Sequence, residues 1–312
     1  MEGSQEHPLF VSAESISDCL EFKDLIPAVE KGLATFSRRS GDELIQPLRT
    51  VMTFPESNGY FASMPVYSKI DDIIVTKMVS FFPKNTDVPS HNAVILVFST
   101  KNGLMRAIMD GDVITLKRTA AASAVATKYL TNGQPHTLAI LGSGSQARSH
   151  YAAISHVFKF QQVNIWNHRS AGAEALAKEI GPTAQAFASV EDAVRDADVI
   201  VTVTSSDKPV LKAEWVKPGA HINAVGACRP NWAELDPQLM QNSVVYADSR
   251  EGAMSESGDV IMSKATIHAE IGEMVNDPTL ARPAETTVFK SLGVAVEDAS
   301  AAKIVVDKLK IP

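Results

Sequence analysis

The chain has 312 residues, with 45% hydrophobic and 21% charged residues and a net charge of −7. This length allows two domains with separate cores, and the composition is that of an ordinary globular protein. The acidic balance and the absence of a Lys/Arg block argue against nucleic-acid binding. No apolar run approaches the roughly 20 residues of a membrane span, and the acidic, polar N-terminus does not read as a targeting peptide. The two isolated cysteines indicate neither a disulfide framework nor a zinc site. We therefore expect a cytoplasmic protein without a metal.

The N-terminal part of the chain combines helices with a run of strands. Apolar residues recur at helical spacing over residues 12–41, which predicts a helix. Short segments rich in β-branched and aromatic residues follow between residues 45 and 110, separated by Pro, Gly and Asn. Strands in direct succession predict an antiparallel or mixed sheet. The Ala-rich residues after Gly111 predict a helix that connects to a second domain.

Strands and helices alternate in the second half of the sequence. Strands are predicted at 136–142, 163–167, 183–187, 198–204, 220–227 and 243–249, and helical patterns separate several of them. This alternation predicts a Rossmann-type, doubly wound parallel sheet. Residues 286–309 are predicted as one long helix that folds back onto the N-terminal domain. The expected class is α/β, with a Rossmann domain over 117–286 and an α+β catalytic and dimerisation domain over 1–116 with 287–312.

The segment HTLAILGSGSQARSHY contains the most specific motif of the chain. A predicted strand ends in Gly142, Gly144 follows two residues later, and Ala147 lies in a predicted helix. This order is the dinucleotide fingerprint, in which the glycines allow a tight turn and close approach of a pyrophosphate. The helix N-terminus then offers free N–H groups to the phosphates. The alternative is a purely structural glycine turn.

The end of the next predicted strand indicates which dinucleotide is bound. NAD sites carry an acidic residue about 20 residues after the fingerprint, but the sequence here is Asn167-His168-Arg169. An arginine can clamp a 2′-phosphate that a carboxylate would repel. We therefore predict NADPH as the cofactor, with weaker use of NADH. The alternative is that Arg169 is only a solvated loop charge.

Three cations of the N-terminal half are candidates for catalysis. Alternation places Lys77 on the same strand face as Val75, Val79 and Phe81, where burial would shift its pKa and suit proton transfer. Arg49 and Arg118 could hold a carboxylate beside it. The alternatives are that Lys77 reaches solvent at a sheet edge and that both arginines form structural ion pairs. His91 lies just before a predicted strand, and the alternative for it is a satisfied core or loop histidine.

These residues carry a resemblance to a known family. The strings QPLRTV, VTKMVSF, VPSHNA, MDGDVITLKRTAA, ILGSGSQARSHY and TTVFKSLGVAVEDASAAK resemble the ornithine cyclodeaminase/mu-crystallin family, and the likeness runs from about residue 9 to the C-terminus. It implies a homodimer formed through the N-terminal domain and an active site between the domains.

The resemblance also implies a role for each matching position. Arg49, Lys77 and Arg118 would be catalytic and substrate-binding residues. The implied cofactor-binding set is Ser90, His91, Arg118, Gly142, Gly144, Ser145, Gln146, Asn167, His168, Arg169, Thr204, Ser205, Val225 and Ser291. Because mu-crystallins bind thyroid hormone, the resemblance also implies a possible iodothyronine site at Arg49 and Cys228.

Cys228 distinguishes the subfamilies that the resemblance offers. Ornithine cyclodeaminases carry an Asp at the matching position, whereas ketimine reductases carry a small residue. The expected activity is therefore NADPH-dependent reduction of cyclic ketimine carboxylates, of the piperideine-2-carboxylate and thiomorpholine-carboxylate type, to cyclic imino acids. Two alternatives remain open: an NADPH-dependent thyroid-hormone-binding protein or crystallin, and an amino-acid dehydrogenase of the same family.

Overall fold

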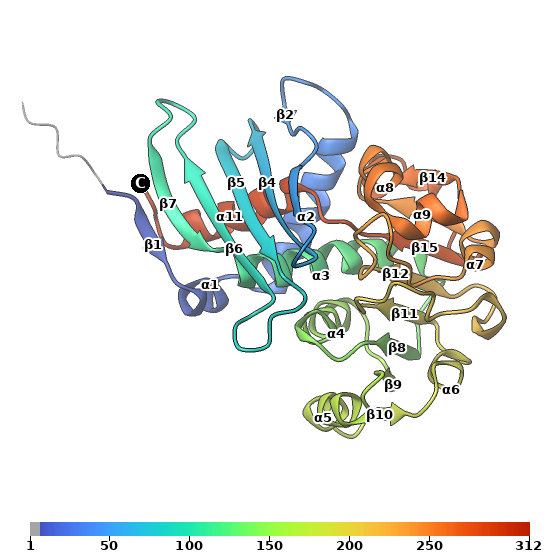
Figure 1. Ribbon diagram of the computed structural model, residues 1–312. Coiled ribbons are helices and arrows are strands. Elements are labelled where there is room, and N and C mark those ends of the chain that lie inside the picture. The colour runs from blue at the N-terminus through green and yellow to red at the C-terminus, as the bar shows by residue number, and fades with distance from the viewer. Residues whose placement is uncertain (1–6) are drawn as a thin grey trace, which may run out of the picture. The chain divides into compact units, whose positions relative to one another are not determined.

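The computed structural model describes residues 7–312, which form two compact units (Figure 1). Of the described residues, the first contains 7–118 together with Val294–Pro312, and the second contains Thr119–Gly293. The boundary at Arg118 falls inside the long helix α3 (Gly111–Leu130). The second unit is therefore inserted, in sequence, into the first.

The first unit is built on a seven-stranded mixed sheet with the order β1-β7-β6-β5-β4-β2, and β3 also pairs with β4. Among the strands described for this unit, only β1 and β7 pair in parallel. The strands are β1 (Leu9–Val11), β2 (Leu44–Ile45), β3 (Thr50–Phe54), β4 (Gly59–Ser68), β5 (Ile73–Phe81), β6 (His91–Phe98) and β7 (Met105–Asp110). The predicted mixed sheet is confirmed.

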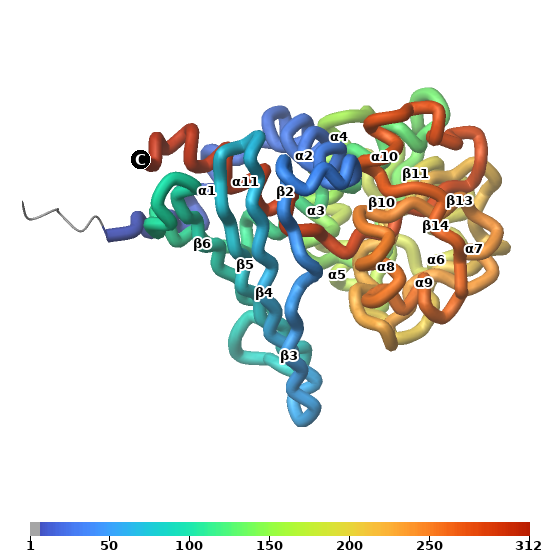
Figure 2. The backbone as a smooth tube through the Cα atoms, turned by 90° about the horizontal axis from the view of Figure 1, so that it is seen from above, coloured from blue at the N-terminus to red at the C-terminus, as the bar shows by residue number. Residues whose placement is uncertain are grey.

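One face of this sheet is covered by helices. The C-terminal helix α11 (Ala295–Lys308) contacts β4, β5 and α2 (Phe22–Ser37), and Figure 2 shows α11 running beside α2. Buried and half-buried residues alternate along β4 and β5, as expected of strands with one covered face. Residues 12–41 form two helices, α1 (Ala13–Cys19) and α2, rather than the single helix predicted, and α2 ends at Ser37.

The second unit is a parallel sheet of eight strands in the order β10-β9-β8-β11-β12-β15-β13-β14. In the chain, β9 and β10 are added on one side of β8, and β11 and β12 are added on its other side. This is the Rossmann strand order, in which the direction of strand addition reverses at β8. Figure 1 shows α4 and α5 on one side of it and α6 and α7 on the other. The strands are β8 (Thr137–Leu141), β9 (Gln162–Trp166), β10 (Ala184–Phe187), β11 (Val199–Thr202), β12 (His221–Ala224), β13 (Val244–Ala247), β14 (Ile267–Glu270) and β15 (Thr287–Lys290). The predicted doubly wound sheet is confirmed.

The helices of this unit include α4 (Ser145–Val157), α5 (Ser170–Ile180), α6 (Val190–Val194), α7 (Pro237–Asn242), α8 (Arg250–Glu256), α9 (Gly258–Ser263) and α10 (Ile271–Asn276), with short 3₁₀ turns at Ala213–Trp215 and Pro278–Leu280. Side chains of β8, β11, β12, β13 and β15 share one buried apolar core with α6 and α7. Ser189 caps α6 by accepting a hydrogen bond from the amide of Asp192.

The C-terminal prediction requires a correction. Residues 286–309 are not one helix, because Thr287–Lys290 forms β15 between β12 and β13. All four residues of β15 are buried, as in a central parallel strand. Residues 287–293 therefore lie with the Rossmann unit and not with the first unit, and only α11 folds back onto the N-terminal sheet. Among residues 7–312 no helix has the length and apolar character needed to cross a bilayer.

Candidate functional site

A buried cluster of charges lies under the sheet of the first unit. The Lys77 ammonium on β5 donates to Asp298 Oδ1 at 3.1 Å and lies 3.0 Å from Oδ2. Arg118 Nε donates to the same Oδ1 at 3.0 Å, and its Nη1 donates to Glu297 Oε2 at 2.7 Å. Lys77 and Arg118 are 1% and 4% exposed. Lys77 therefore points into the protein, as its strand face predicts, and does not reach solvent at an edge.

The buried, charged surroundings of Lys77 determine its pKa. Burial and the positive charges of Arg118 and Arg49 lower the pKa of Lys77 to about 8, although Asp298 opposes the shift. A buried ammonium between cations gives up its proton more easily than a solvated lysine does. Lys77 is thus a group that can donate or accept a proton near neutral pH.

Arg49 belongs to the same electrostatic environment. It lies just before β3 rather than inside a strand, it is half-buried, and its charge acts on Lys77. Lys77 and Arg118 pair with the carboxylates Glu297 and Asp298, and Arg49 adds a further positive charge to the surroundings of Lys77.

Ser90 and His91 stand apart from this cluster within the first unit. His91 begins β6 and pairs in register with Phe81, whereas Lys77 pairs with Ile95. Four residues along a strand correspond to roughly 13 Å. The imidazole Nδ1 of His91 lies 2.7 Å from Asp112 Oδ1, at the start of α3, and is partly exposed.

The second unit forms the glycine turn at the end of β8. Gly142 has φ +120°, and a Cβ there would lie 2.8 Å from the carbonyl oxygen of Val203, so only glycine fits. Gly144 precedes α4, and a Cβ on it would meet nothing within 4 Å. Ala147 is fully buried where the helix starts. An open approach at Gly144, directed at the N-terminus of a 13-residue helix, fits a pyrophosphate.

The loop after β9 lies beside this turn. A Cβ on Gly172 of α5 would lie 2.5 Å from Ser143 Oγ and 2.8 Å from Asn167 Nδ2. Asn167 Nδ2 donates to the carbonyl of Arg169 at 3.0 Å. His168 and Arg169 are exposed, and neither carries a carboxylate neighbour in sequence. The loop after β9 can therefore accept an anionic group at His168 and Arg169.

The remaining predicted cofactor residues of this unit lie at the carboxyl ends of neighbouring strands. Thr204 and Ser205 follow β11, Val225 follows β12, and Ser291 follows β15, so the sheet brings them to the edge that carries Gly142. Ligands of open α/β sheets bind at this edge. Ser145 begins α4, and Gln146 follows it. Cys228, half-buried on the loop after β12, belongs to the second unit, and Arg49 to the first.

Sequence reasoning missed the acidic members of both units. Glu297 and Asp298 hold Lys77 and Arg118, and their only signal is two adjacent carboxylates in an Ala- and Val-rich helix. Glu234 and Asp259 are likewise fully enclosed in the second unit, and nothing in their local sequence marks them. A buried carboxylate needs partners, and these partners are distant in sequence.

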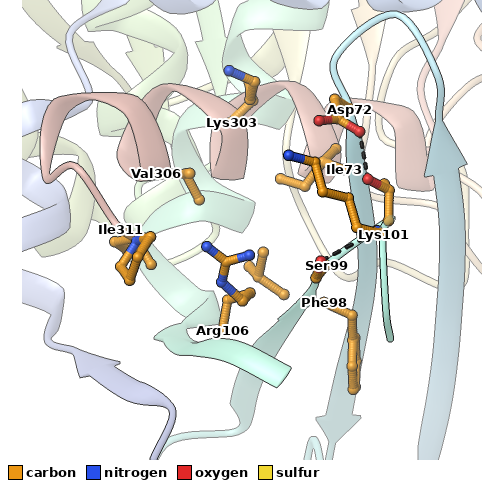
Figure 3. A pocket seen from close by; sticks show the side chains of 12 residues that line it. Asp72, Ile73, Phe98, Ser99, Lys101, Arg106, Lys303, Val306 and Ile311 are labelled. Carbon is orange, nitrogen blue, oxygen red and sulfur yellow. Dashed lines mark hydrogen bonds between the residues drawn. The ribbon is translucent and has the colours of Figure 1, made fainter. Parts of the chain in front are cut away.

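A small cavity at the end of the first unit's sheet contains none of the predicted site residues. It has a volume of about 240 Å³ and lies between β5, β6, β7 and the C-terminal residues. Figure 3 shows Arg106 in the middle of its lining, with Lys101, Lys303 and Asp72 around it. The buried charge cluster of the first unit and the glycine turn of the second remain the two candidate sites.

Comparison with known proteins gives a consistent result. Residues 6–311 match the model of the ornithine cyclodeaminase/mu-crystallin family. A ketimine reductase mu-crystallin of Macropus fuliginosus is 50% identical over 305 residues, with 96% of this chain and 97% of that protein covered. A Delta(1)-pyrroline-2-carboxylate reductase of Bacillus cereus is 31% identical over 316 residues, with 96% of each covered.

A solved structure extends this likeness to three dimensions. The Thermococcus litoralis Delta(1)-pyrroline-2-carboxylate reductase, in complex with NADH and L-proline, superposes with a TM-score of 0.91 at 32% identity. The superposition covers 97% of each chain. The family model, the relatives and this structure each match almost the full length of the protein. The chain therefore belongs to the ornithine cyclodeaminase/mu-crystallin family.

Proposed function

We propose that this protein reduces the C=N bond of cyclic ketimine carboxylates, of the piperideine-2-carboxylate and thiomorpholine-carboxylate type, to cyclic imino acids with NADPH. The observation that carries the proposal is the buried cluster of Lys77, Arg118, Glu297 and Asp298, in which the pKa of Lys77 is about 8. Relatives that are ketimine and pyrroline-carboxylate reductases support this substrate class.

The cations of the first unit would bind the substrate through its carboxylate. Arg49 is half-buried, and its positive charge acts on Lys77. A guanidinium presents two parallel N–H donors to a carboxylate and fixes its orientation. Arg118 already contacts both acidic residues of α11, so its guanidinium is held rigidly. Arg49 and Arg118 would thus place the C=N bond at a defined distance from Lys77.

Lys77 would keep the imine nitrogen protonated. An iminium carbon is a stronger electrophile than a neutral imine carbon, and the nitrogen needs a proton when the bond becomes single. A group with a pKa near the working pH performs this transfer best. Asp298 holds the Lys77 ammonium in place by accepting from it at 3.1 Å.

The second unit would be the Rossmann domain that holds the dinucleotide, and the first unit would be the catalytic and dimerisation domain. Gly142 and Gly144 leave room for the pyrophosphate, and Ser145 and Gln146 offer donors at the start of α4. Arg169, exposed at the end of β9, would pair with a 2′-phosphate and favour NADPH over NADH. When bound, the reduced nicotinamide supplies the hydride that adds to the imine carbon.

The uncovered face of the first unit's sheet supports homodimer formation. The residues Phe10, Ile108, Leu96, Thr76 and Pro65 are consecutive register partners across five strands. Phe10 is 70% exposed and the other four are half-buried. We propose this row as part of the dimer surface. Sedimentation should give a dimer for the natural protein, and Leu96→Glu should shift it to the monomer; an unchanged dimer would reject this face.

The activity is tested by mixing the protein with Δ1-piperideine-2-carboxylate and NADPH and following the loss of nicotinamide absorbance. We expect rapid consumption of NADPH and slower consumption of NADH. If NADPH binds but is not consumed, the catalytic proposal is wrong. Calorimetry with an iodothyronine, with and without NADPH, would then decide whether the protein is a hormone carrier instead.

A further inference from the structure

Glu234 is a fully buried carboxylate that collects four hydrogen bonds in the second unit. Its Oε1 accepts from the Thr204 amide and, at 2.6 Å, from the Thr204 hydroxyl. Its Oε2 accepts from the Thr202 hydroxyl and the Gly226 amide, each at 2.7 Å. All four partners are donors, and two of them are backbone amides, which can only donate.

These bonds join two loops at the carboxyl edge of the sheet. Thr202 ends β11, Thr204 lies in the loop after it, and Gly226 lies in the loop after β12. The loops are so close that a Cβ on Gly226 would lie 1.8 Å from the Thr204 carbonyl oxygen and 2.3 Å from Glu234 Oε1. The carboxylate of Glu234 therefore bridges the two loops, which also bond directly where the Val225 and Gly226 amides donate to the Thr202 carbonyl at 3.0 and 3.2 Å.

The same network extends to a third strand. Asp259 Oδ1 accepts from the Glu234 amide at 2.8 Å and from the Leu235 amide at 3.0 Å. Asp259 Oδ2 pairs at 3.1 Å with the ammonium of Lys290, the last residue of β15. Both side chains of that pair are completely buried. Glu234 and Asp259 thus connect the ends of β11, β12 and β15.

Each connected position is next to a residue that we assign to the cofactor. Thr204 is itself one of them, Gly226 follows Val225, and Lys290 precedes Ser291. Ser291 Oγ is buried and accepts or donates no hydrogen bond within residues 7–312. These strands lie on the opposite side of β8 from β9, which carries Arg169. The network is therefore at the end of the dinucleotide site opposite the 2′-phosphate.

We propose that Glu234 is a positioning residue, which fixes the loops after β11 and β12 in the spacing that the nicotinamide half of the cofactor requires. This inference rests on the proposed dinucleotide function. Glutamine cannot replace Glu234, because either orientation of its amide would direct an NH₂ group at the backbone N–H of Thr204 or of Gly226. The Glu234→Gln variant therefore keeps the shape of the side chain but separates the loops.

The test compares two ligands that share the 2′-phosphate end. Calorimetry with NADPH and with 2′,5′-ADP, which lacks the nicotinamide, should show at least tenfold weaker NADPH binding by Glu234→Gln and unchanged 2′,5′-ADP binding. Equal weakening of both ligands would mean that Glu234 only supports the fold, and unchanged NADPH binding would also overturn the proposal. If the natural protein binds neither ligand, the dinucleotide function itself fails, and this inference fails with it.

Asp198 provides a matched control at the amino-terminal ends of the strands of the same sheet. Its Oδ2 accepts from the His136 and Thr137 amides at 2.7 and 2.9 Å, so it joins the starts of β8 and β11 as Glu234 joins later strand ends. Asp198→Asn should lower the melting temperature without changing the affinity for either ligand. If Glu234→Gln does not fold, Thr202→Val removes one of the four donors and should weaken NADPH binding selectively, by a smaller factor. Equal affinity of Thr202→Val and the natural protein for NADPH would then reject the proposal.

Discussion

Replacing Lys77 with methionine should remove most of the activity while making the fold more stable. Lowering the pKa from 10.5 to about 8 means that the charged ammonium costs the folded state about 3 kcal/mol at neutral pH. The attraction of Asp298 is already contained in that shift. Methionine has a similar shape and no charge, and Asp298 keeps Arg118 at 3.0 Å. The melting temperature should therefore rise by several degrees.

The pH dependence of this stability gives an independent check. Between about pH 8 and 10.5 the unfolded chain holds the Lys77 proton more tightly than the folded protein does. The natural protein therefore gains stability as the pH rises through that window. The stability of Lys77→Met does not rise in this way. The higher stability of the variant over the natural protein should therefore disappear near pH 10.5. Thermal melts of both proteins at a series of pH values measure the difference directly.

Kinetics of the same variant test the proton-transfer role. Loss of a positioned general acid should lower kcat by about 100-fold or more, with the KM for NADPH unchanged. For the natural protein, kcat/KM should fall above pH 8 as Lys77 loses its proton. Lys31→Met, on the exposed part of α2, is the control and should change neither property. A lower melting temperature for Lys77→Met would refute the electrostatic argument, and unchanged turnover would refute the role of Lys77.

Three further predictions concern residues within one or the other unit. Arg169→Ser should weaken NADPH binding at least tenfold and leave NADH binding unchanged, because only NADPH carries the 2′-phosphate; fluorescence titration of both cofactors checks this. Gly226→Ala should fail to give soluble protein or should unfold at much lower urea, because the new Cβ would overlap the Thr204 carbonyl oxygen. Arg118→Met should cost about 3–5 kcal/mol in a urea titration, because it leaves the buried carboxylates of α11 short of positive charge; a loss below about 1 kcal/mol would contradict that pairing.

Features with a local signal were predictable from the sequence. The turn at Gly142 follows from the order of strand, glycines and helix, and the structure places Gly142 at the end of β8. The buried position of Lys77 follows from the period of two along a strand, which fixes the face of each residue once neighbours such as Val75 and Val79 are apolar. Both arguments need only a few consecutive residues.

Features that depend on distant partners were not predictable. Lys77 and Asp298 are separated by 221 positions, and no local pattern states which strand will meet which helix. The residues of β15 were assigned to a helix because four residues are too few to show a period, and the helix after them is genuine. The carboxylate of Glu234 lies in a loop and shows its importance only through the four donors that surround it.

The division of the first unit between the two ends of the chain has a consequence for biosynthesis. Domains generally form in order from the N-terminus as the ribosome elongates the chain. Here, however, the acidic partners of Lys77 and Arg118 lie on α11, within the last stretch to be translated. The inserted Rossmann unit has all of its strands before that point. It should therefore acquire native structure first, while the N-terminal sheet waits for translation to finish, and a nascent chain stalled before residue 294 should expose two unneutralised cations.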